Sequence, residues 1–301
     1  MDFYQSLGLD QGISVDHIVF GFIPEEKKAK GSQPDPDWFR RRELTIQLAS
    51  DFLREVKVRK VPFEPIGVAH GWDLASYQLS VKELQDIGYT RISMGGMVPL
   101  KTDDILNVLQ AVSDIRNRST RLHLLGVTRT ESMPKFAKFG VASFDSTSPF
   151  RQAFMDASDN YYVFDRTYTA IRVPQVNGNV SLKKRILAGH IDHKEVRGIE
   201  RSCLRLLRAF DQGEAKLDEV LKALRAYEII YDANGTDRSE QSLEVLLDAP
   251  WKKCRCGICE SVGIEIIMFR GSERNKRRGF HNLAVFRERL NAHRSITRRV
   301  S

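Results

Sequence analysis

Three cysteines and one histidine in the C-terminal third of the 301-residue chain have the types and the spacing of a metal site. Cys254, Cys256 and Cys259 fit into one tight turn, and His281 follows them. Three thiolates and one imidazole complete the tetrahedral shell of a structural zinc ion and leave no position open for catalysis. A set of buried free thiols is the alternative. We predict zinc as a structural cofactor, held by a subdomain at residues 254–281.

Composition and charge limit the classes of protein to which the chain can belong. With 42% hydrophobic and 29% charged residues, the chain can bury the core of a globular protein. No apolar run approaches the roughly 18 residues that cross a bilayer, and the first residues lack the pattern of a signal peptide. We therefore expect a cytoplasmic protein with no membrane partner. The net charge of +8 favours polyanionic partners such as nucleic acid, although many basic proteins bind none.

Strand and helix patterns alternate along the first half of the chain, which implies parallel βαβ units. Apolar runs predict strands at 13–20, 65–69, 91–94, 122–125 and 141–144. We predict an α/β fold of the (β/α)8 TIM-barrel type, N-terminally incomplete, with about five βα units visible in residues 1–150. Residues 151–301 are predicted to form a helical extension with the zinc-binding subdomain and a C-terminal helix over 282–290.

Polar residues and glycines follow nearly every predicted strand. They include Asp16, His17, His70, Gly71, Gly95, Gly96, Gly126 and Asp145. An open doubly wound sheet is the alternative architecture, but no Gly-rich dinucleotide fingerprint follows any strand. In (β/α)8 barrels the active site is built at the C-terminal ends of the strands. The pattern therefore favours a barrel with its active site at that rim.

Five stretches, together with the cysteine spacing, resemble the tRNA-guanine transglycosylase family. They are GVAHG at 67–71, ISMGGM at 92–97, HLLGVTR at 123–129, FDSTS at 144–148 and FHNL at 280–283. They occur in the family's order and span nearly the whole chain. His70 stands where the tRNA enzymes usually carry Gln, and the run after Asp145 also departs from theirs. In these details the chain resembles the DNA-modifying branch, which inserts 7-deazaguanine bases into DNA in bacteria and phages.

The resemblance implies that Asp145 is the catalytic nucleophile. Its carboxylate would attack the anomeric C1′ carbon as guanine departs, forming a covalent sugar–aspartate ester that a second base then resolves. From the residues alone, the N-cap of a helix that begins at 146–148 is the favoured interpretation of Asp145.

Six more residues match positions that bind the base in the family: Asp16, His70, Gly71, Gly95, Gly96 and Met97. The resemblance implies that Asp16 accepts hydrogen bonds from the N1–H and exocyclic amine of a guanine-like base. It also implies that His70 contacts the carbonyl edge, that the glycines let the base come close, and that Met97 packs against the purine face. The alternatives are a turn aspartate, a structural histidine, ordinary tight turns and a core methionine.

A basic stretch next to the zinc ligands is the candidate for binding a nucleic-acid backbone. Its cations are Arg270, Arg274, Lys276, Arg277 and Arg278, on a loop that we expect the zinc ion to fix. A solvated charged face is the alternative. A base must leave its stack to reach a barrel rim, which implies a flipped nucleotide or a single strand.

The family's barrel contains three strands before the position that Asp16 matches, and one of them carries a second Asp with a proton-transfer role. A longer native chain, a complementing polypeptide and a loss of activity are the three explanations. Because a half barrel exposes a parallel edge and an apolar face, we expect association with a complementing N-terminal segment or with another copy.

Three functions remain open at this point. The first is exchange of guanine in DNA for 7-cyano-7-deazaguanine (preQ0). The second is the same chemistry on tRNA. The third is a non-catalytic, zinc-containing subunit that binds nucleic acid and needs a partner.

Overall fold

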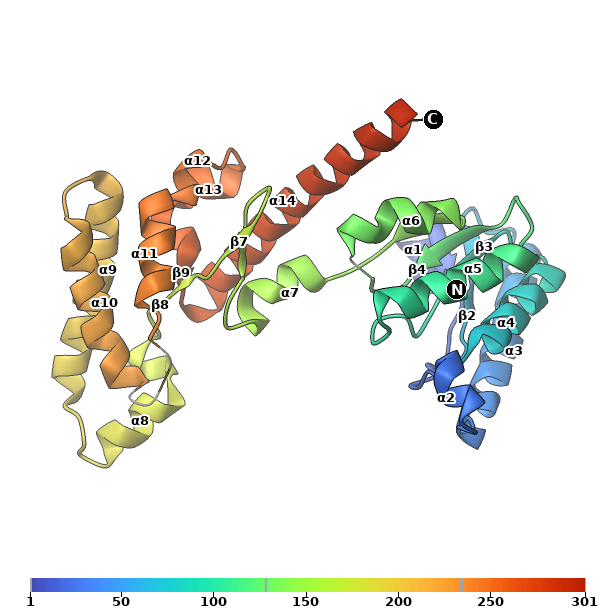
Figure 1. Ribbon diagram of the computed structural model, residues 1–301, viewed down its shortest axis with the longest axis horizontal. Coiled ribbons are helices and arrows are strands. Elements are labelled where there is room, and N and C mark those ends of the chain that lie inside the picture. Colours follow the sequence, from blue (N-terminus) through green and yellow to red (C-terminus); the bar gives the residue numbers. More distant parts are fainter. Residues whose placement is uncertain (1, 128, 233–234, 236, 301) are drawn as a thin grey trace. The chain divides into compact units, whose positions relative to one another are not determined.

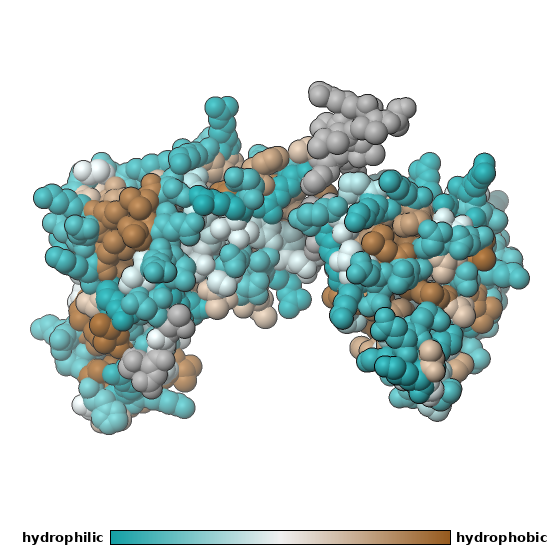
Figure 2. All heavy atoms as spheres, viewed as in Figure 1, coloured by the Kyte–Doolittle hydropathy of each residue, from teal (hydrophilic) through white to brown (hydrophobic). Residues whose placement is uncertain are grey.

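The computed structural model describes residues 2–127, 129–232, 235 and 237–300, with the side chains of 130 and 293–300 excepted, so Thr128 of the HLLGVTR stretch lies outside the described residues. The chain forms two compact units, residues 1–146 and 147–301 (Figure 1). The domain boundary that we expected at residue 150 falls inside α7 (Ser148–Met155). Pro149 lies in the first turn of that helix and does not end an element. On the face shown in Figure 2, hydrophilic side chains cover most of each unit. None of the described helices is long and apolar enough to cross a membrane.

A five-stranded parallel sheet forms the centre of the first unit. Its strands are β1 (Gln11–Ile13), β2 (Glu64–Ala69), β3 (Arg91–Met94), β4 (Arg121–Leu124) and β5 (Val141–Phe144). They lie side by side in chain order. A doubly wound sheet would reverse its order at a switch point, so the observed order is that of consecutive βα units. Within the described residues the sheet is open, with β1 and β5 at its two edges.

The first strand differs from its prediction at 13–20, because it begins at Gln11 and ends at Ile13. The amide of Ser14 still donates to a β2 carbonyl, at 2.9 Å. The amide of His17 donates instead to the hydroxyl of Thr45, also at 2.9 Å. The pairing with β2 therefore stops, and the residues after β1 form a loop at the end of the sheet.

Four helices pack against one face of this sheet and enclose the core of the first unit. They are α3 (Pro36–Arg59), α4 (Leu74–Ile87), α5 (Thr102–Ile115) and α6 (Met133–Lys138). The short helices α1 (Asp2–Ser6) and α2 (Glu25–Ala29) and a 3-10 turn (Thr130–Ser132) complete the unit. Ile92 and Met94 on β3 and Leu122 and Leu124 on β4 are buried against these helices. Because side chains alternate along a strand, Ser93 and His123 lie on the opposite face.

The second unit is mainly helical. Its longer helices are α7, α8 (Val180–Leu187), α9 (His193–Gln212), α10 (Leu217–Tyr231), α11 (Ser239–Asp248) and α14 (Gly271–Val300), and the short helices are α12 (Pro250–Lys253) and α13 (Gly257–Val262). Two 3-10 turns (Val176–Gly178, Gly263–Ile267), an antiparallel hairpin of β6 (Tyr161–Tyr162) and β7 (Thr167–Tyr168), and a parallel pair of β8 (Ile171–Arg172) and β9 (Met268–Phe269) complete it.

The last helix is longer than its prediction at 282–290. It begins at Gly271, whose φ of 62° lies in the left-handed region, and runs through the basic stretch. The basic residues after 270 therefore lie on a helix and not on a loop. The apolar pattern at 282–290 marked one buried part of α14, and Arg278 and His281 before it are also fully buried.

Candidate active site and metal centre

Four of the predicted site residues lie at one edge of the first unit. Asp16 follows β1, His70 follows β2, Gly95 follows β3 and Asp145 follows β5. Because the strands are parallel, their carboxyl ends meet at this edge. The residues that could do chemistry therefore come from loops at the same end of one sheet.

The side chain of Asp145 is 60% exposed at the end of β5. Its Oδ1 atom accepts a hydrogen bond from the backbone N–H of Gly126 (3.0 Å) and lies 3.1 Å from Nε2 of His123. Within the described residues, no group donates to Oδ2. The N-cap of α7 is Thr147, so Asp145 does not cap that helix. A carboxylate with one oxygen held and the other open to solvent is suited to nucleophilic attack.

A register shift between β4 and β5 accounts for the position of this carboxylate. Leu122 pairs with Val141, whereas the next residue, His123, pairs with Ser143. Ala142 is therefore an extra residue on β5, as in a β-bulge.

The bulge changes which face of the sheet the end of β5 presents. Val141 and Phe144 both pack against the core on the helix side. Residues three apart on a regular strand would point to opposite faces. The extra residue thus puts Phe144 into the core and Ser143 and Asp145 on the face of His123. There the Ser143 hydroxyl lies 2.9 Å from Nδ1 of His123.

Asp16 is held by a buried histidine. Nε2 of His70 lies 2.6 Å from Oδ2 of Asp16, and the side chains are 0% and 29% exposed respectively. The ring of His70 lies against Gly95, where a Cβ would be 2.7 Å from Nε2 and 2.9 Å from Nδ1. Gly95 therefore makes room for His70. The expected contact of His70 with the carbonyl edge of a base does not fit this burial, and His70 instead orients Asp16.

Three other predicted base-binding residues have packing roles. A Cβ at Gly71 would lie 2.7 Å from the backbone nitrogen of Tyr77, so Gly71 allows α4 to approach. Gly96 has a φ of 74°, which favours glycine, and a Cβ there would lie 3.1 Å from the Tyr77 hydroxyl. Met97 and Met94 are fully buried in the core of the first unit. We expected Met97 to pack against the face of a purine, but its burial in the core does not allow this contact.

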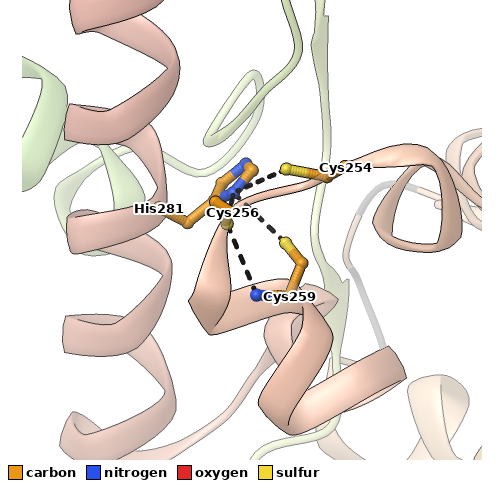
Figure 3. Close-up of side chains that lie close together, drawn as sticks. All are labelled: Cys254, Cys256, Cys259 and His281. Carbon is orange, nitrogen blue, oxygen red and sulfur yellow. Dashed lines mark hydrogen bonds between the residues drawn. The ribbon is translucent and has the colours of Figure 1, made fainter.

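The four predicted metal ligands converge in the second unit (Figure 3). Nδ1 of His281 lies 3.3 Å from the sulfurs of Cys256 and Cys259 and 3.7 Å from that of Cys254. All four ligand atoms lie within 4.8 Å of one another. With zinc–sulfur bonds of about 2.3 Å and zinc–nitrogen bonds of about 2.0 Å, the corners of a tetrahedron are roughly 3.5 Å apart, so these atoms fit the ion.

Neighbouring groups fix the orientation of His281. Its Nε2 atom lies 2.8 Å from the carbonyl oxygen of Tyr162. Donation of the Nε2 proton to that oxygen leaves the lone pair of Nδ1 for a metal. The ring of Tyr161 stacks on the imidazole, with centroids 4.3 Å apart and planes 5° from parallel. His281 lies within α14, so a metal here would join that helix to α13, which contains Cys259, and to the loop before α13.

The pKa values of the three thiols are shifted in opposite directions by their mutual contacts. A hydrogen bond with Cys259 lowers the pKa of Cys254 to about 3. Burial opposes ionisation of Cys256, but hydrogen bonds from His281 and the Cys259 amide lower its pKa overall. The hydrogen bond with Cys254 and burial raise the pKa of Cys259. A third thiolate in this cluster therefore needs a positive ion, and zinc fits the donor set.

The structure changes the role of one predicted phosphate-binding residue. Arg278 is fully buried, and its guanidinium donates to the carbonyl oxygens of Ala153 (2.6 Å), Ile266 (3.2 Å) and Met268 (3.1 Å). The guanidinium of Arg278 also makes a cation–π interaction with Phe269, with its Cζ atom 5.1 Å from the centroid of the phenyl ring. Arg278 thus satisfies buried backbone carbonyls and is not available to a phosphate.

Three other cations of the basic stretch are engaged in ion pairs. These pairs are Arg270–Glu200, Arg274–Glu265 and Arg277–Glu273. The Arg270 pair is almost buried, so that arginine too is removed from the phosphate-binding set, whereas the Arg277 pair is exposed and easily exchanged. Lys276 is exposed on α14.

Two residues in the singled-out stretches have contacts that the sequence did not predict. His123 touches Asp145, as described above. Asn282 is fully buried, accepts from the amide of Tyr162 at 3.0 Å and donates to the carbonyls of Pro149 and Asn160, both at 3.1 Å. The sequence feature that could have indicated a role for these two residues is their position in the HLLGVTR and FHNL stretches.

Comparison with known proteins adds independent information. No family model matches the chain. A DNA-guanine transglycosylase of Salmonella montevideo is 43% identical over 295 residues, which make up 96% of this chain and 70% of the relative. Such identity over nearly the whole chain, with the strand-end carboxylates and the Cys3His cluster assembled as above, shows common descent. The chain belongs to the guanine transglycosylase family of pentosyltransferases.

Proposed function

We propose that this protein exchanges guanine in DNA for a 7-deazaguanine base, 7-cyano-7-deazaguanine, through a covalent bond between Asp145 and the sugar. The observation that carries the proposal is the Asp145 carboxylate, exposed at the end of β5 with one oxygen held and the other open. The name of the S. montevideo relative favours DNA over tRNA as the substrate.

The exchange takes two displacements at C1′. In the first, an Asp145 oxygen bonds to C1′ while the C1′–N9 bond breaks, and the departing guanine keeps the electron pair and takes a proton from water. In the second, N9 of the incoming base bonds to C1′, the ester bond breaks, the pair returns to the carboxylate and the N9 proton passes to water. The phosphodiester backbone takes no part, so the strand stays intact.

Asp16 is the proposed acceptor for the N1–H and the exocyclic amine of the base. His70 holds its Oδ2, which leaves Oδ1 for the base. Guanine and 7-deazaguanines share this edge and differ at position 7, on the other side of the purine. One carboxylate can therefore serve the leaving and the incoming base. The base must first leave the helical stack, as in other enzymes that act on a base.

The zinc cluster has a structural role in this proposal. By holding α14, the ion would keep the exposed Lys276 and Arg277 in position to contact phosphates. Arg274, half-buried beside Glu265, would add to the positive electrostatic potential of this surface without contacting the DNA backbone. The net charge of +8 supports the same partner.

The proposed architecture is a barrel of the (β/α)8 type. Consecutive strand order and helices on one face support it. In the described chain the outer sides of β1 and β5 pair with no strand. We propose that a complementing N-terminal segment or a second copy covers these edges. Sedimentation of the purified chain tests this part, and a stable monomer with one cooperative unfolding transition would contradict it.

The catalytic proposal is tested by trapping. The protein is incubated with guanine-containing DNA and run on a denaturing gel, where a covalent adduct is expected for the wild type and not for Asp145→Asn. Asp114→Asn, on the exposed side of α5, is the matched control and should form the adduct normally. Mass spectrometry of nucleosides from DNA and tRNA of expressing cells identifies the substrate. Modified nucleoside in tRNA alone would refute the DNA assignment.

A further inference from the structure

We infer that His123 is a positioning residue for the nucleophile: with the N–H of Gly126 it fixes the Asp145 carboxylate so that one defined oxygen, Oδ2, meets the sugar. This inference rests on the proposed function of Asp145. The two donors converge on the same oxygen, Oδ1, at 3.1 and 3.0 Å. A carboxylate that is 60% exposed would otherwise rotate freely, so the two contacts fix the plane in which it attacks.

The imidazole is itself oriented from its other side. Nδ1 of His123 lies 2.9 Å from the hydroxyl of Ser143, and the side chain is only 16% exposed. If the hydroxyl donates to Nδ1, the ring proton is on Nε2, where it can be donated to Asp145. The chain Ser143–His123–Asp145 thus runs along one face of β4 and β5, which the bulge at Ala142 brings into register.

Stereochemistry separates this role from proton transfer to the base. In each displacement the nucleophile and the leaving group occupy opposite faces of C1′. A group hydrogen-bonded to Asp145 is therefore on the face away from the base. His123 consequently acts through the carboxylate and not on guanine.

The same contacts favour the second displacement. When the ester bond to C1′ breaks, its electron pair returns to the carboxylate, and negative charge develops on both oxygens. Donors already aimed at Oδ1 stabilise that charge without reorganisation. Removal of His123 should therefore slow the resolution of the covalent intermediate as well as its formation.

The test compares His123→Phe, which fills the space without a donor, with His123→Gln, which can restore an N–H. For the Phe variant we expect kcat, and the rate at which added 7-deazaguanine base chases preformed adduct, to fall roughly tenfold to a hundredfold, as for loss of a hydrogen bond to a charged group. KM for DNA should stay within about twofold, because the contact is made to the reacting carboxylate and not to the substrate. The Gln variant should recover most of the rate.

Controls separate this inference from the proposed function. Exposed His190, in the second unit, supplies the matched control His190→Gln, which should behave as the wild type. Thermal unfolding and zinc content establish that each variant is folded. If the Phe variant does not fold, Ser143→Ala replaces it, with an expected fall of a few-fold in the chase rate. Wild-type rates in the folded variants, or an effect on KM alone, would overturn the role of His123. Absence of any wild-type adduct would instead overturn the proposed function.

Discussion

Replacement of Gly95 by Ala is expected to break the contact between His70 and Asp16 and to destabilise the first unit. The new methyl group would lie 2.7 Å from Nε2 and 2.9 Å from Nδ1 of His70, well inside van der Waals contact. The ring is fully buried, so the new methyl group would have to displace it against its packed surroundings. Overpacking costs about 1–3 kcal/mol, and the lost hydrogen bond to a carboxylate about 1.5–3 kcal/mol.

The sum is about 2.5–6 kcal/mol, which should lower Tm by roughly 10–20 °C in a unit of this size. Thermal and urea unfolding measure the change. Gly198→Ala is the control, because its Cβ would meet nothing within 4 Å in the middle of α9, and it should raise stability by about 0.5–1 kcal/mol. In a His70→Ala background the clash is absent, so Gly95→Ala should cost less than about 1 kcal/mol. An equal cost in both backgrounds would refute this account of Gly95.

Three other predictions concern the second unit. Cys256→Ser, or removal of metal by a chelator, should destabilise this unit and release α14, with loss of bound zinc measured by atomic absorption and loss of helix by circular dichroism. Arg278→Met should cost about 3 kcal/mol or more in denaturant unfolding, because three buried carbonyls lose their donor, whereas the exposed Arg277→Met should stay within about 0.5 kcal/mol. Burial raises the pKa of Glu265, but hydrogen bonds from Arg208 and Arg274 outweigh it, and the net pKa is below the ordinary 4.5. The stability from Glu265 and its two arginines is thus present above pH 4.5 and is lost as the pH falls through the depressed pKa, so Glu265→Gln should destabilise most at pH 7 and progressively less as the pH falls below 4.5.

The sequence was sufficient for features that depend on local pattern. The strands at Arg91–Met94 and Val141–Phe144 have the predicted bounds, because short apolar runs between helices leave little choice. The cysteine spacing likewise predicted a cluster that the structure assembles, with His281 as the fourth member. In both cases the determining information lies within a few residues along the chain.

Features that depend on distant contacts were not predictable. Arg278 looks like any surface cation in the sequence, and only the carbonyls of Ala153 and Met268 make it an interior residue. His70 looks like a base-contacting residue, and only the loop after β1 shows that its partner is Asp16. Sequence periodicity reports the face of an element but not which group lies opposite it.

The number of residues on β5 after the bulge at Ala142 is as important as the composition of the strand. Residues 141–145 serve two environments, with Val141 and Phe144 in the core and Ser143 and Asp145 at the catalytic edge. Deletion of Ala142 would leave Ser143, Phe144 and Asp145 on their present faces, because Val141, Ser143 and Phe144 would then pair in unbroken order with Leu122, His123 and Leu124. Loss of Phe144, which follows the bulge, would instead turn the nucleophile toward the helices. Evolution of this segment is therefore expected to tolerate exchange or loss of residue 142 and to reject any single-residue insertion or deletion between positions 143 and 145.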